Sequence, residues 1–244
     1  LAGDWQDPFE APQLVDHEGF KVIREDLMGF GSKCRFGDIL VQTCPKDTLV
    51  YVQPRYGFAG ISLAYLAKKY NKKLVLFSPS QKEISDHQAI CVEMGAEMKF
   101  KRIAAMPVLN AHAKKWAEAN NAFFIPLGLK HELVTAAAVK VAHTIAETHG
   151  YPDEVWSAIS TGVLQRSLQI AWPDATFNGV AVARNIKKGE RGIAEVWSHP
   201  KAFTQDVDPK YNPPFPSAMN YDAKAWEFMK KNGTPGAWFW NVGG

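Results

Sequence analysis

Residues 50–77 have the sequence VYVQPRYGFAGISLAYLAKKYNKKLVLF, and this stretch decides the fold class. Its two ends, Val50–Gln53 and Lys73–Phe77, are short apolar runs that predict buried strands. Between them, Ala59–Tyr70 places apolar residues at helical spacing, namely Ile61, Leu63, Ala64, Leu66 and Ala67. A strand, a helix and a second strand in this order form a βαβ unit, in which the two strands are parallel.

The same alternation continues through the rest of the chain and predicts an α/β protein, with helices packed on a parallel or mixed sheet. Helices are expected over Ser85–Met94, Pro107–Ala119, Glu132–His149, Leu164–Ala171 and Asp222–Lys231. Strands are expected over Met98–Ile103, Ala122–Pro126, Glu154–Ile159, Gly179–Ala183 and Ala237–Val242. Glu154–Ala183 therefore forms a second βαβ unit, whose first strand leads into its helix through Ser160–Gly162.

The composition is that of a globular protein and excludes disorder, because 46% of the 244 residues are hydrophobic and 22% are charged. The formal charge of +3 does not make nucleic acid or a membrane the expected partner, although nucleic acid is not excluded. Three scattered cysteines indicate free thiols in a reducing compartment. The chain shows neither a long uncharged apolar run nor a secretory signal at its first residue, so we expect a cytoplasmic protein without a membrane partner.

Several familiar motifs are missing. Gly29–Lys33 has neither the third glycine of a dinucleotide fingerprint nor the ending of a phosphate-binding P-loop. The chain has no Gly-x-Ser-x-Gly nucleophile elbow. Its histidines and cysteines do not have the paired spacing of metal ligands, so we expect no metal site.

The segment Arg24–Arg35, REDLMGFGSKCR, resembles the region around the Schiff-base lysine of the fold-type II pyridoxal-phosphate (PLP) enzymes. These enzymes form the tryptophan synthase β-like superfamily. Within it, the segment is most similar to the 1-aminocyclopropane-1-carboxylate deaminase and D-cysteine desulfhydrase family, whose pattern is Arg-Asp-Asp-Leu-x-Gly-Phe-Gly-Gly-Asn-Lys-x-Arg. Lys33 stands at the position of the family's lysine. One residue of the family's Gly-Gly-Asn is missing, and Ser32 occupies the asparagine position.

Further segments resemble the family in the same order along the chain. They are Gly57–Ala64, Glu93–Glu97, Ile125–Gly128, Ser160–Leu164, Tyr221–Trp226 and Trp238–Gly244. The resemblance implies a two-domain, three-layer α/β/α fold of the tryptophan synthase β-like type, and a homodimer. Residues 1–44 plus 128–244 are expected to form the larger, cofactor-binding domain, and residues 45–127 the smaller α/β domain.

The resemblance also implies the roles of individual residues. Lys33 would form the Schiff base with PLP and move the proton at the substrate's α-carbon. A lysine amine reacts with an aldehyde only when neutral, so such a site must lower the amine's pKa. Ser160, Thr161 and Gly162 would bind the cofactor phosphate, Asp222 would keep the ring nitrogen protonated, and Tyr221 would lie near the substrate.

The same residues also suit structures without a cofactor. Ser160–Gly162 could be a plain strand-to-helix turn, in which Thr161, Val163 and Arg166 replace the family's small residues, although Arg166 could add positive charge. Tyr221-Asp222 could simply begin a helix, since aspartate is a preferred N-cap residue.

The largest departure from the family lies at Gln53–Phe58. Family members carry a Ser-Asn pair that holds the substrate carboxylate and the cofactor hydroxyl, and this chain has Gly57 and Phe58 there. A phenyl ring cannot replace the donors and acceptors of an amide. Either Arg55 and Tyr56 recognise the substrate instead, or the usual amino-acid substrate has been abandoned.

Three hypotheses follow, and we favour the first. The protein is a PLP-dependent lyase or deaminase-like enzyme that acts on an amino acid or amine-bearing substrate through Lys33. Alternatively, it is a pseudoenzyme that keeps the fold without PLP and acts as a binding or regulatory module. A third hypothesis is modification of a nucleotide or nucleic acid, with Arg55 and Arg166 contacting phosphates.

Overall fold

The computed structural model describes residues 1–243. They fall into two compact units: unit 1 is residues 1–32 with 135–243, and unit 2 is Lys33–Val134. The domain division expected from the sequence differs from these units at residues 33–44 and 128–134, which it assigns to the larger domain. Gly244, the last residue of the predicted closing segment, lies outside the described residues.

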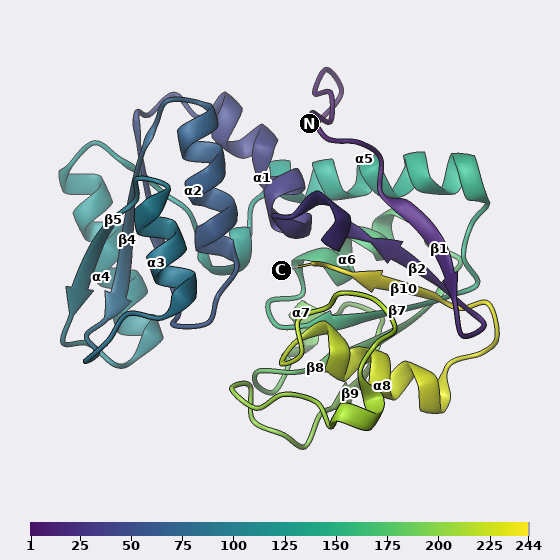
Figure 1. Ribbon diagram of the computed structural model, residues 1–244. Coiled ribbons are helices and arrows are strands. Elements are labelled where there is room, and N and C mark those ends of the chain that lie inside the picture. The colour runs from purple at the N-terminus through teal and green to yellow at the C-terminus, as the bar shows by residue number, and fades with distance from the viewer. Residues whose placement is uncertain (244) are drawn as a thin grey trace. The chain divides into compact units, whose positions relative to one another are not determined.

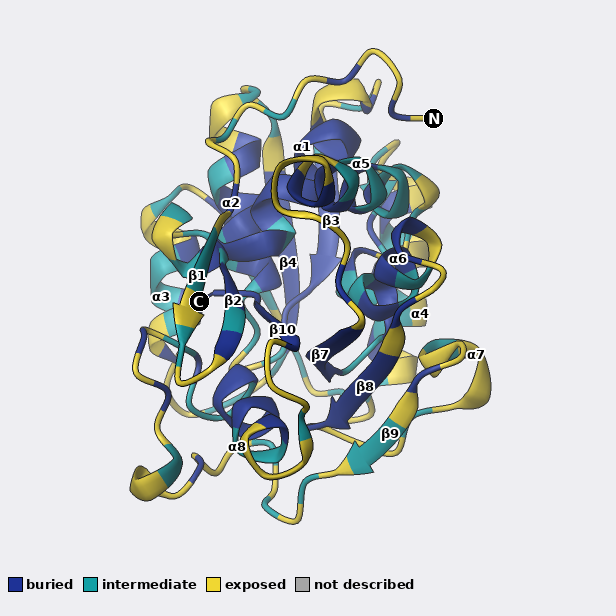
Figure 2. Ribbon diagram, turned by 90° about the vertical axis from the view of Figure 1, so that its right-hand side faces the viewer, coloured by how far each residue is buried: buried dark blue, intermediate teal, exposed yellow. Residues whose placement is uncertain are grey.

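Unit 1 contains, within its described residues, a six-stranded sheet in the order β1-β2-β10-β7-β8-β9 (Figure 1). Its strands are β1 (Gln13–His17), β2 (Phe20–Arg24), β7 (Glu154–Ile159), β8 (Thr176–Ala181), β9 (Glu195–Ser198) and β10 (Trp238–Asn241). β1 and β2 form an antiparallel hairpin around Glu18 and Gly19, and all other neighbours are parallel. Figure 2 shows the central strands as buried, which is typical of parallel sheets covered on both faces.

Helices cover both faces of this sheet. They are most of α5 (Glu132–His149), α6 (Val163–Ala171), the short α7 (Lys188–Arg191) and α8 (Asp222–Asn232), with 3₁₀ turns η1 (Glu25–Met28) and η3 (Pro209–Tyr211). Successive strand residues point to opposite faces. Trp156 of β7 accordingly packs in one core with Trp226 of α8, whereas the next residue, Ser157, hydrogen-bonds Gln165 of α6.

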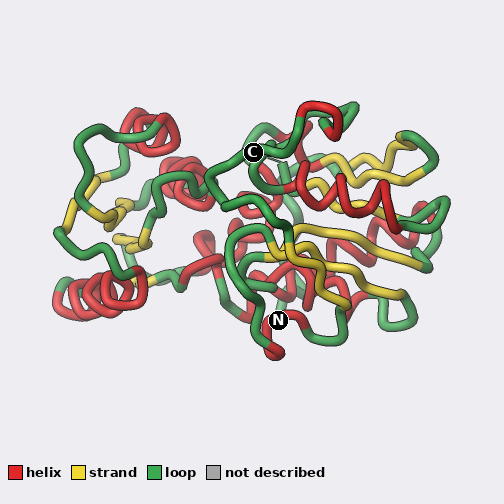
Figure 3. Tube along the Cα trace, turned by 90° about the horizontal axis from the view of Figure 1, so that it is seen from below, coloured by secondary structure: helices red, strands yellow, loops and turns green. Residues whose placement is uncertain are grey.

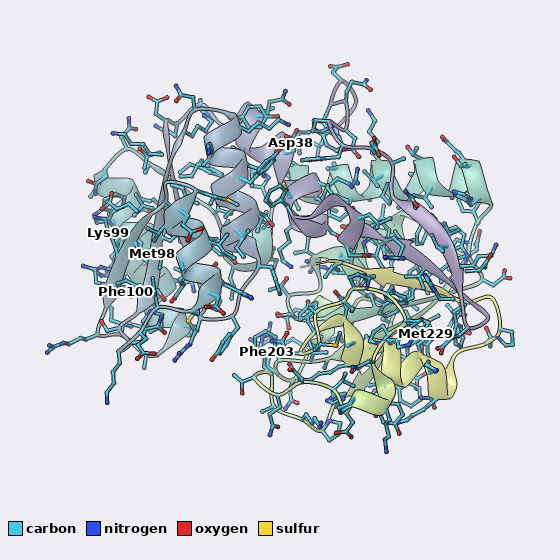
Figure 4. The ribbon with its side chains drawn as sticks, in the orientation of Figure 1. Asp38, Met98, Lys99, Phe100, Phe203 and Met229 are labelled. Carbon is cyan, nitrogen blue, oxygen red and sulfur yellow. The ribbon has the colours of Figure 1, made fainter. Side chains whose placement is uncertain are left out.

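Unit 2 contains a four-stranded parallel sheet in the order β5-β4-β3-β6, and Figure 3 shows helices on either side of it. Its elements are most of α1 (Gly31–Thr43), β3 (Thr48–Val52), α2 (Ala59–Lys69), β4 (Lys73–Pro79), α3 (Asp86–Glu93), β5 (Glu97–Lys101), α4 (Met106–Ala119), β6 (Phe123–Phe124) and η2 (Leu127–Leu129). α4 packs Leu109, Ala113 and Ala117 on one face of the sheet. Asp38 joins α1 to α2 by accepting hydrogen bonds from Lys69 and Tyr70 (Figure 4).

In each unit the chain reverses the direction in which it adds strands. In unit 1 it forms β7, β8 and β9 in succession and then returns through α8 to place β10 on the other side of β7. In unit 2 it forms β3, β4 and β5 and then returns through α4 to place β6 beside β3. Open α/β sheets bind ligands outside the carboxyl ends of their strands at such a reversal. The loops after β7 and β10, and those after β3 and β6, are therefore the places to look for a site.

The α/β prediction is confirmed, and the two expected βαβ units are β3-α2-β4 and β7-α6-β8. The strand expected over Gly179–Ala183 begins earlier, at Thr176, and ends at Ala181. Strands β1, β2 and β9 were not predicted. None of the helices within residues 1–243 combines the length and apolar character needed to cross a lipid bilayer.

Candidate functional site

The turn Ser160–Gly162 lies at the reversal in unit 1. It follows β7 directly. The loop after the neighbouring strand, β10, begins at Val242. β7 and β10 are parallel, with Phe239 paired to Trp156, so both loops leave the same edge of the sheet. The predicted phosphate turn thus stands where the topology of unit 1 favours a ligand.

The geometry of this turn suits an anion. Gly162 is the N-cap of α6 in the left-handed conformation, with φ 73°, and no side chain among the described residues caps the helix. The first N–H groups of a helix have no acceptor within the helix, and the helix dipole adds positive potential there. Ser160 and Thr161, both half-buried, add two hydroxyls next to these groups. Such an arrangement can hold a phosphate.

The segment around α7 packs against the turn. A Cβ added at Gly162 would lie 1.9 Å from the carbonyl oxygen of Glu190. Arg166 donates from Nη1 to the carbonyl oxygen of Gly189 at 2.7 Å, and Gln169 donates to that of Arg191 at 2.8 Å. Arg166, which was expected to add charge at the turn, therefore also ties α7 to α6.

Asp222 and Tyr221 begin α8. α8 leads into the parallel strand β10, so it runs antiparallel to the strands of the sheet. The amino end of α8 therefore lies at the carboxyl ends of the strands, where the Ser160–Gly162 turn also lies. Asp222 is fully buried in the first turn of α8. Tyr221 packs edge-on against Phe203 at 6.4 Å between ring centroids (Figure 4). Burial raises the pKa of Tyr221, and the charge of Asp222 raises it further.

The sequence analysis missed a third polar residue at this edge. Asn241, the last residue of β10, is fully buried. Its amide donates to Asp26 Oδ1 at 2.7 Å and to the carbonyl oxygen of Pro216 at 2.9 Å, and it accepts from Ser217 Oγ at 3.0 Å. The sequence analysis included Asn241 only within the closing segment Trp238–Gly244 and gave it no role, because these partners are 215, 25 and 24 residues away in the chain.

We expect Asn241→Ala to destabilise the protein by about 2–3 kcal/mol, because it removes these buried hydrogen bonds and leaves their partners unsatisfied. Urea unfolding followed by circular dichroism measures this change. Asn232→Ala is the matched control, since the exposed Asn232 amide donates only to the carbonyl oxygen of Phe228 at 2.8 Å. The control should lie within about 0.5 kcal/mol of the parent, and equal losses in both variants would contradict the prediction.

Lys33 lies in the first turn of α1 and is half-buried. The residue before it is held against the end of β10 in unit 1: Ser32 N donates to the carbonyl oxygen of Val242 at 2.8 Å, and Trp240 Nε1 donates to Ser32 Oγ at 2.9 Å. Gly31 has φ 68°, and a Cβ there would lie 2.6 Å from that same carbonyl oxygen. These contacts fix the backbone of Ser32, the residue immediately before Lys33, at the end of β10.

The predicted substrate residues Arg55, Tyr56, Gly57 and Phe58 form the loop that follows β3, at the reversal in unit 2. Arg55 and Tyr56 are exposed, and Gly57 and Phe58 are half-buried. The buried Gln53 holds the loop through two hydrogen bonds. Its amide donates to the carbonyl oxygen of Gly57 and accepts from Gly60 N. Phe58 is the N-cap of α2 and contributes no capping hydrogen bond.

His87 of α3 packs on this loop and was also missed by the sequence analysis. Its ring centroid lies 4.3 Å from that of Phe58 and 6.5 Å from that of Tyr56. Burial lowers the pKa of His87, although Asp86 and a hydrogen bond to the Tyr56 backbone act in the opposite direction. The imidazole is therefore neutral at neutral pH and packs as a third aromatic ring against the loop. No group of three or more metal-binding side chains occurs within residues 1–243.

No protein-family model matches the sequence, and no curated protein is similar to it. Solved structures are similar in fold. An ACC deaminase homologue superposes with a TM-score of 0.76 at 17% identity, over 97% of this chain and 92% of that one. The fold is that of the tryptophan synthase β-like PLP enzymes.

Two further structures with this fold are similar to the chain. A threonine deaminase from T.th. has a TM-score of 0.71 at 15% identity, over 92% of this chain and 87% of that one. Escherichia coli diaminopropionate ammonia lyase has a TM-score of 0.72 at 12% identity, over 99% and 84%. The predicted tryptophan synthase β-like fold is confirmed, and at these identities the likeness is one of fold.

Proposed function

We propose that the protein binds PLP and uses it in a lyase or deaminase-like reaction on an amino acid or another amine-bearing substrate. One observation carries the proposal. Three features lie at the carboxyl ends of the strands in unit 1. They are the uncapped amino end of α6 after Gly162, the fully buried Asp222, and Ser32, which directly precedes Lys33. The fold is one in which the structural neighbours are deaminases and lyases.

The residues present fit the cofactor. The Ser160–Gly162 turn offers backbone N–H groups and hydroxyls for a dianionic phosphate. Asp222 offers a buried carboxylate to a ring N–H, and the amine of Lys33 offers the covalent attachment. When bound, PLP supplies an electron sink for the bond that breaks at the substrate's amine-bearing carbon.

The remaining roles belong to side chains of this chain. Lys33 would hold the cofactor through its amine, and the same amine would move the proton at the substrate's α-carbon. The phenol of Tyr221 is protonated at neutral pH, as for any tyrosine, and burial raises its pKa further, so it can donate a hydrogen bond near the substrate. Arg55, Tyr56, Gly57 and Phe58 are the residues that we propose to bind the substrate, as the family resemblance implies.

Cofactor uptake tests the proposal. The protein is incubated with PLP, freed of excess cofactor and examined by absorption spectroscopy. Treatment with borohydride then makes the attachment permanent, and peptide mass spectrometry locates it. We expect a visible band and a pyridoxyl group on Lys33. A colourless protein, or a label spread over exposed lysines, would refute the proposal.

A second candidate function is that of a pseudoenzyme that keeps the fold without PLP. It is favoured by Phe58, whose ring packs on His87 where the similar family has an amide for the cofactor hydroxyl. This candidate predicts no visible band at any PLP concentration and no label on Lys33. A stoichiometric pyridoxyl group on Lys33 would exclude it.

Three further features remain proposals. We infer a homodimer and a cytoplasmic location, and a larger cofactor-binding domain of residues 1–44 plus 128–244 beside a smaller one of residues 45–127. Light scattering during size-exclusion chromatography tests the dimer. A monomer at the working concentration would contradict it.

A further inference from the structure

Three rings and a guanidinium form an aromatic surface at the reversal in unit 2. We define the ring cluster as Tyr56, Phe58 and His87. His87 contacts Phe58 with a ring tilt of 46° and meets Tyr56 edge-on, at 84°. The Arg55 guanidinium lies 5.5 Å from the centroid of the Tyr56 ring, and Tyr56 is 38% exposed. An aromatic face and a positive charge are thus presented together by one loop.

The polar side chains around this loop are used for its own support. Gln53 uses its amide to bind Gly57 and Gly60. Ser85 donates its hydroxyl to the carbonyl oxygen of Arg55 and accepts from Gln88 N, as the N-cap of α3. These bonds hold the loop in place and leave the rings and the guanidinium as the groups that the loop presents.

This combination selects among ligands. A guanidinium binds a carboxylate or a phosphate. An aromatic cluster beside it favours a ligand with a flat ring of its own, which stacks on the exposed Tyr56 ring. His87 strengthens the aromatic character because its imidazole is neutral.

The charge of unit 2 supports an anionic ligand. Residues 33–134 contain 15 lysines and arginines against 8 aspartates and glutamates, a formal charge of +7, whereas the remaining residues contain 13 against 17, a charge of −4. The modest charge of the whole chain hides this difference. A positive field around unit 2 raises the local concentration of anions and speeds their association.

We propose that the Arg55–Phe58 loop and His87 bind a nucleotide: the base stacks on the ring cluster, and Arg55 pairs with the phosphate. The inference rests on the proposed function in so far as this loop contacts the substrate, and the nucleotide is then the part of the substrate that lies away from its amine-bearing carbon. The nucleotide is either free or part of a single strand, since a base and a phosphate are common to both.

The test uses isothermal titration calorimetry of the protein, both without PLP and after PLP uptake and borohydride reduction, so that the cofactor site is occupied in the second sample. The titrants are AMP, adenosine, ribose 5-phosphate, alanine and a short oligodeoxyadenylate. We expect AMP to bind, and adenosine and ribose 5-phosphate each to bind at least about tenfold more weakly, because each lacks one of the two groups recognised. Alanine should not compete with AMP.

Variants place the binding on the loop. Arg55→Ala and Tyr56→Ala should each weaken AMP binding about tenfold. Arg102→Ala is the charge control, and Phe100→Ala is the ring control. Phe100 is 38% exposed, as Tyr56 is, and lies on the edge strand β5 (Figure 4). Both controls should bind AMP as the parent does.

The outcomes separate the inference from the proposed function. Absence of AMP and oligonucleotide binding, or equal affinity in the parent and both loop variants, would overturn the inference even in a protein that takes up PLP. Binding that depends on Arg55 and Tyr56 supports it even in a protein that remains colourless. An oligonucleotide that binds more tightly than AMP, with a steep salt dependence, identifies a single strand as the source, and equal affinity identifies the free nucleotide.

Discussion

Replacing Lys33 with alanine should abolish the visible band after PLP incubation and lower any turnover by about 10²- to 10⁴-fold. The reason is chemical: only an amine can bond the cofactor aldehyde, and an alanine methyl cannot move a proton. Lys33 lies in the first turn of α1, directly after Ser32, which is held at the end of β10. Absorption spectra and borohydride labelling measure the effect.

Two further variants show whether the loss is specific to the amine of Lys33. Lys33→Arg keeps the positive charge and cannot form the bond, so it should also remain colourless. Lys130→Ala removes an exposed lysine of unit 2 and should keep the full band. Thermal unfolding should show that all three variants remain folded. A Lys33→Ala protein that keeps both the band and turnover would show that another group does this chemistry.

Gly162→Ala should lower the stability by about 3 kcal/mol. The left-handed conformation of residue 162 costs an alanine about 1 kcal/mol. Its Cβ would also lie 1.9 Å from the carbonyl oxygen of Glu190, a backbone atom that cannot move as a side chain would. Overpacking of this kind costs about 1–3 kcal/mol. Differential scanning calorimetry should show Tm lowered by roughly 6–12 °C, together with weaker PLP retention, because the turn is displaced.

Gly150→Ala is the matched control for this prediction. Gly150 ends α5 with φ 84°, and nothing lies within 4 Å of a Cβ added there. The Gly150→Ala variant should therefore lose only about 1 kcal/mol of stability, from the left-handed backbone conformation alone. It should retain PLP as the parent does. Equal losses of Tm in the two variants would show that α7 does not pack on the turn as described.

The parts of the fold that the sequence predicted correctly are those set by local pattern. Residues 50–77 predict a βαβ unit because strands buried on both faces are continuous apolar runs, whereas a helix repeats its apolar residues every three or four positions. The β1–β2 hairpin was missed for the same reason. β1 is an edge strand with the sequence QLVDH, in which polar residues interrupt the apolar ones.

The candidate site divides in the same way. Ser160–Gly162, Lys33 and the Arg55–Phe58 loop each lie where a strand or helix begins or ends, so their positions in the secondary structure followed from local pattern and from the family resemblance. The contacts that give His87 and Asn241 their roles could not be found in this way. Each carries an ordinary side chain in an ordinary element, and each matters because of a neighbour that is distant in the chain, Phe58 for His87 and Asp26 for Asn241.

By itself, the sequence determined the α/β class, the order of most strands and helices along the chain, and the presence of glycine at the turns, because these depend on side-chain periodicity and backbone preference over a few residues. Only the tertiary structure decided which strands are neighbours, and hence where the two reversals lie. It also decided which atoms surround each polar group, for example that Ser32 bonds the end of β10 and that Glu190 closes on Gly162. The physical reason is that strand pairing and side-chain packing join residues far apart in the chain, and their free energy depends on the whole arrangement rather than on any one segment.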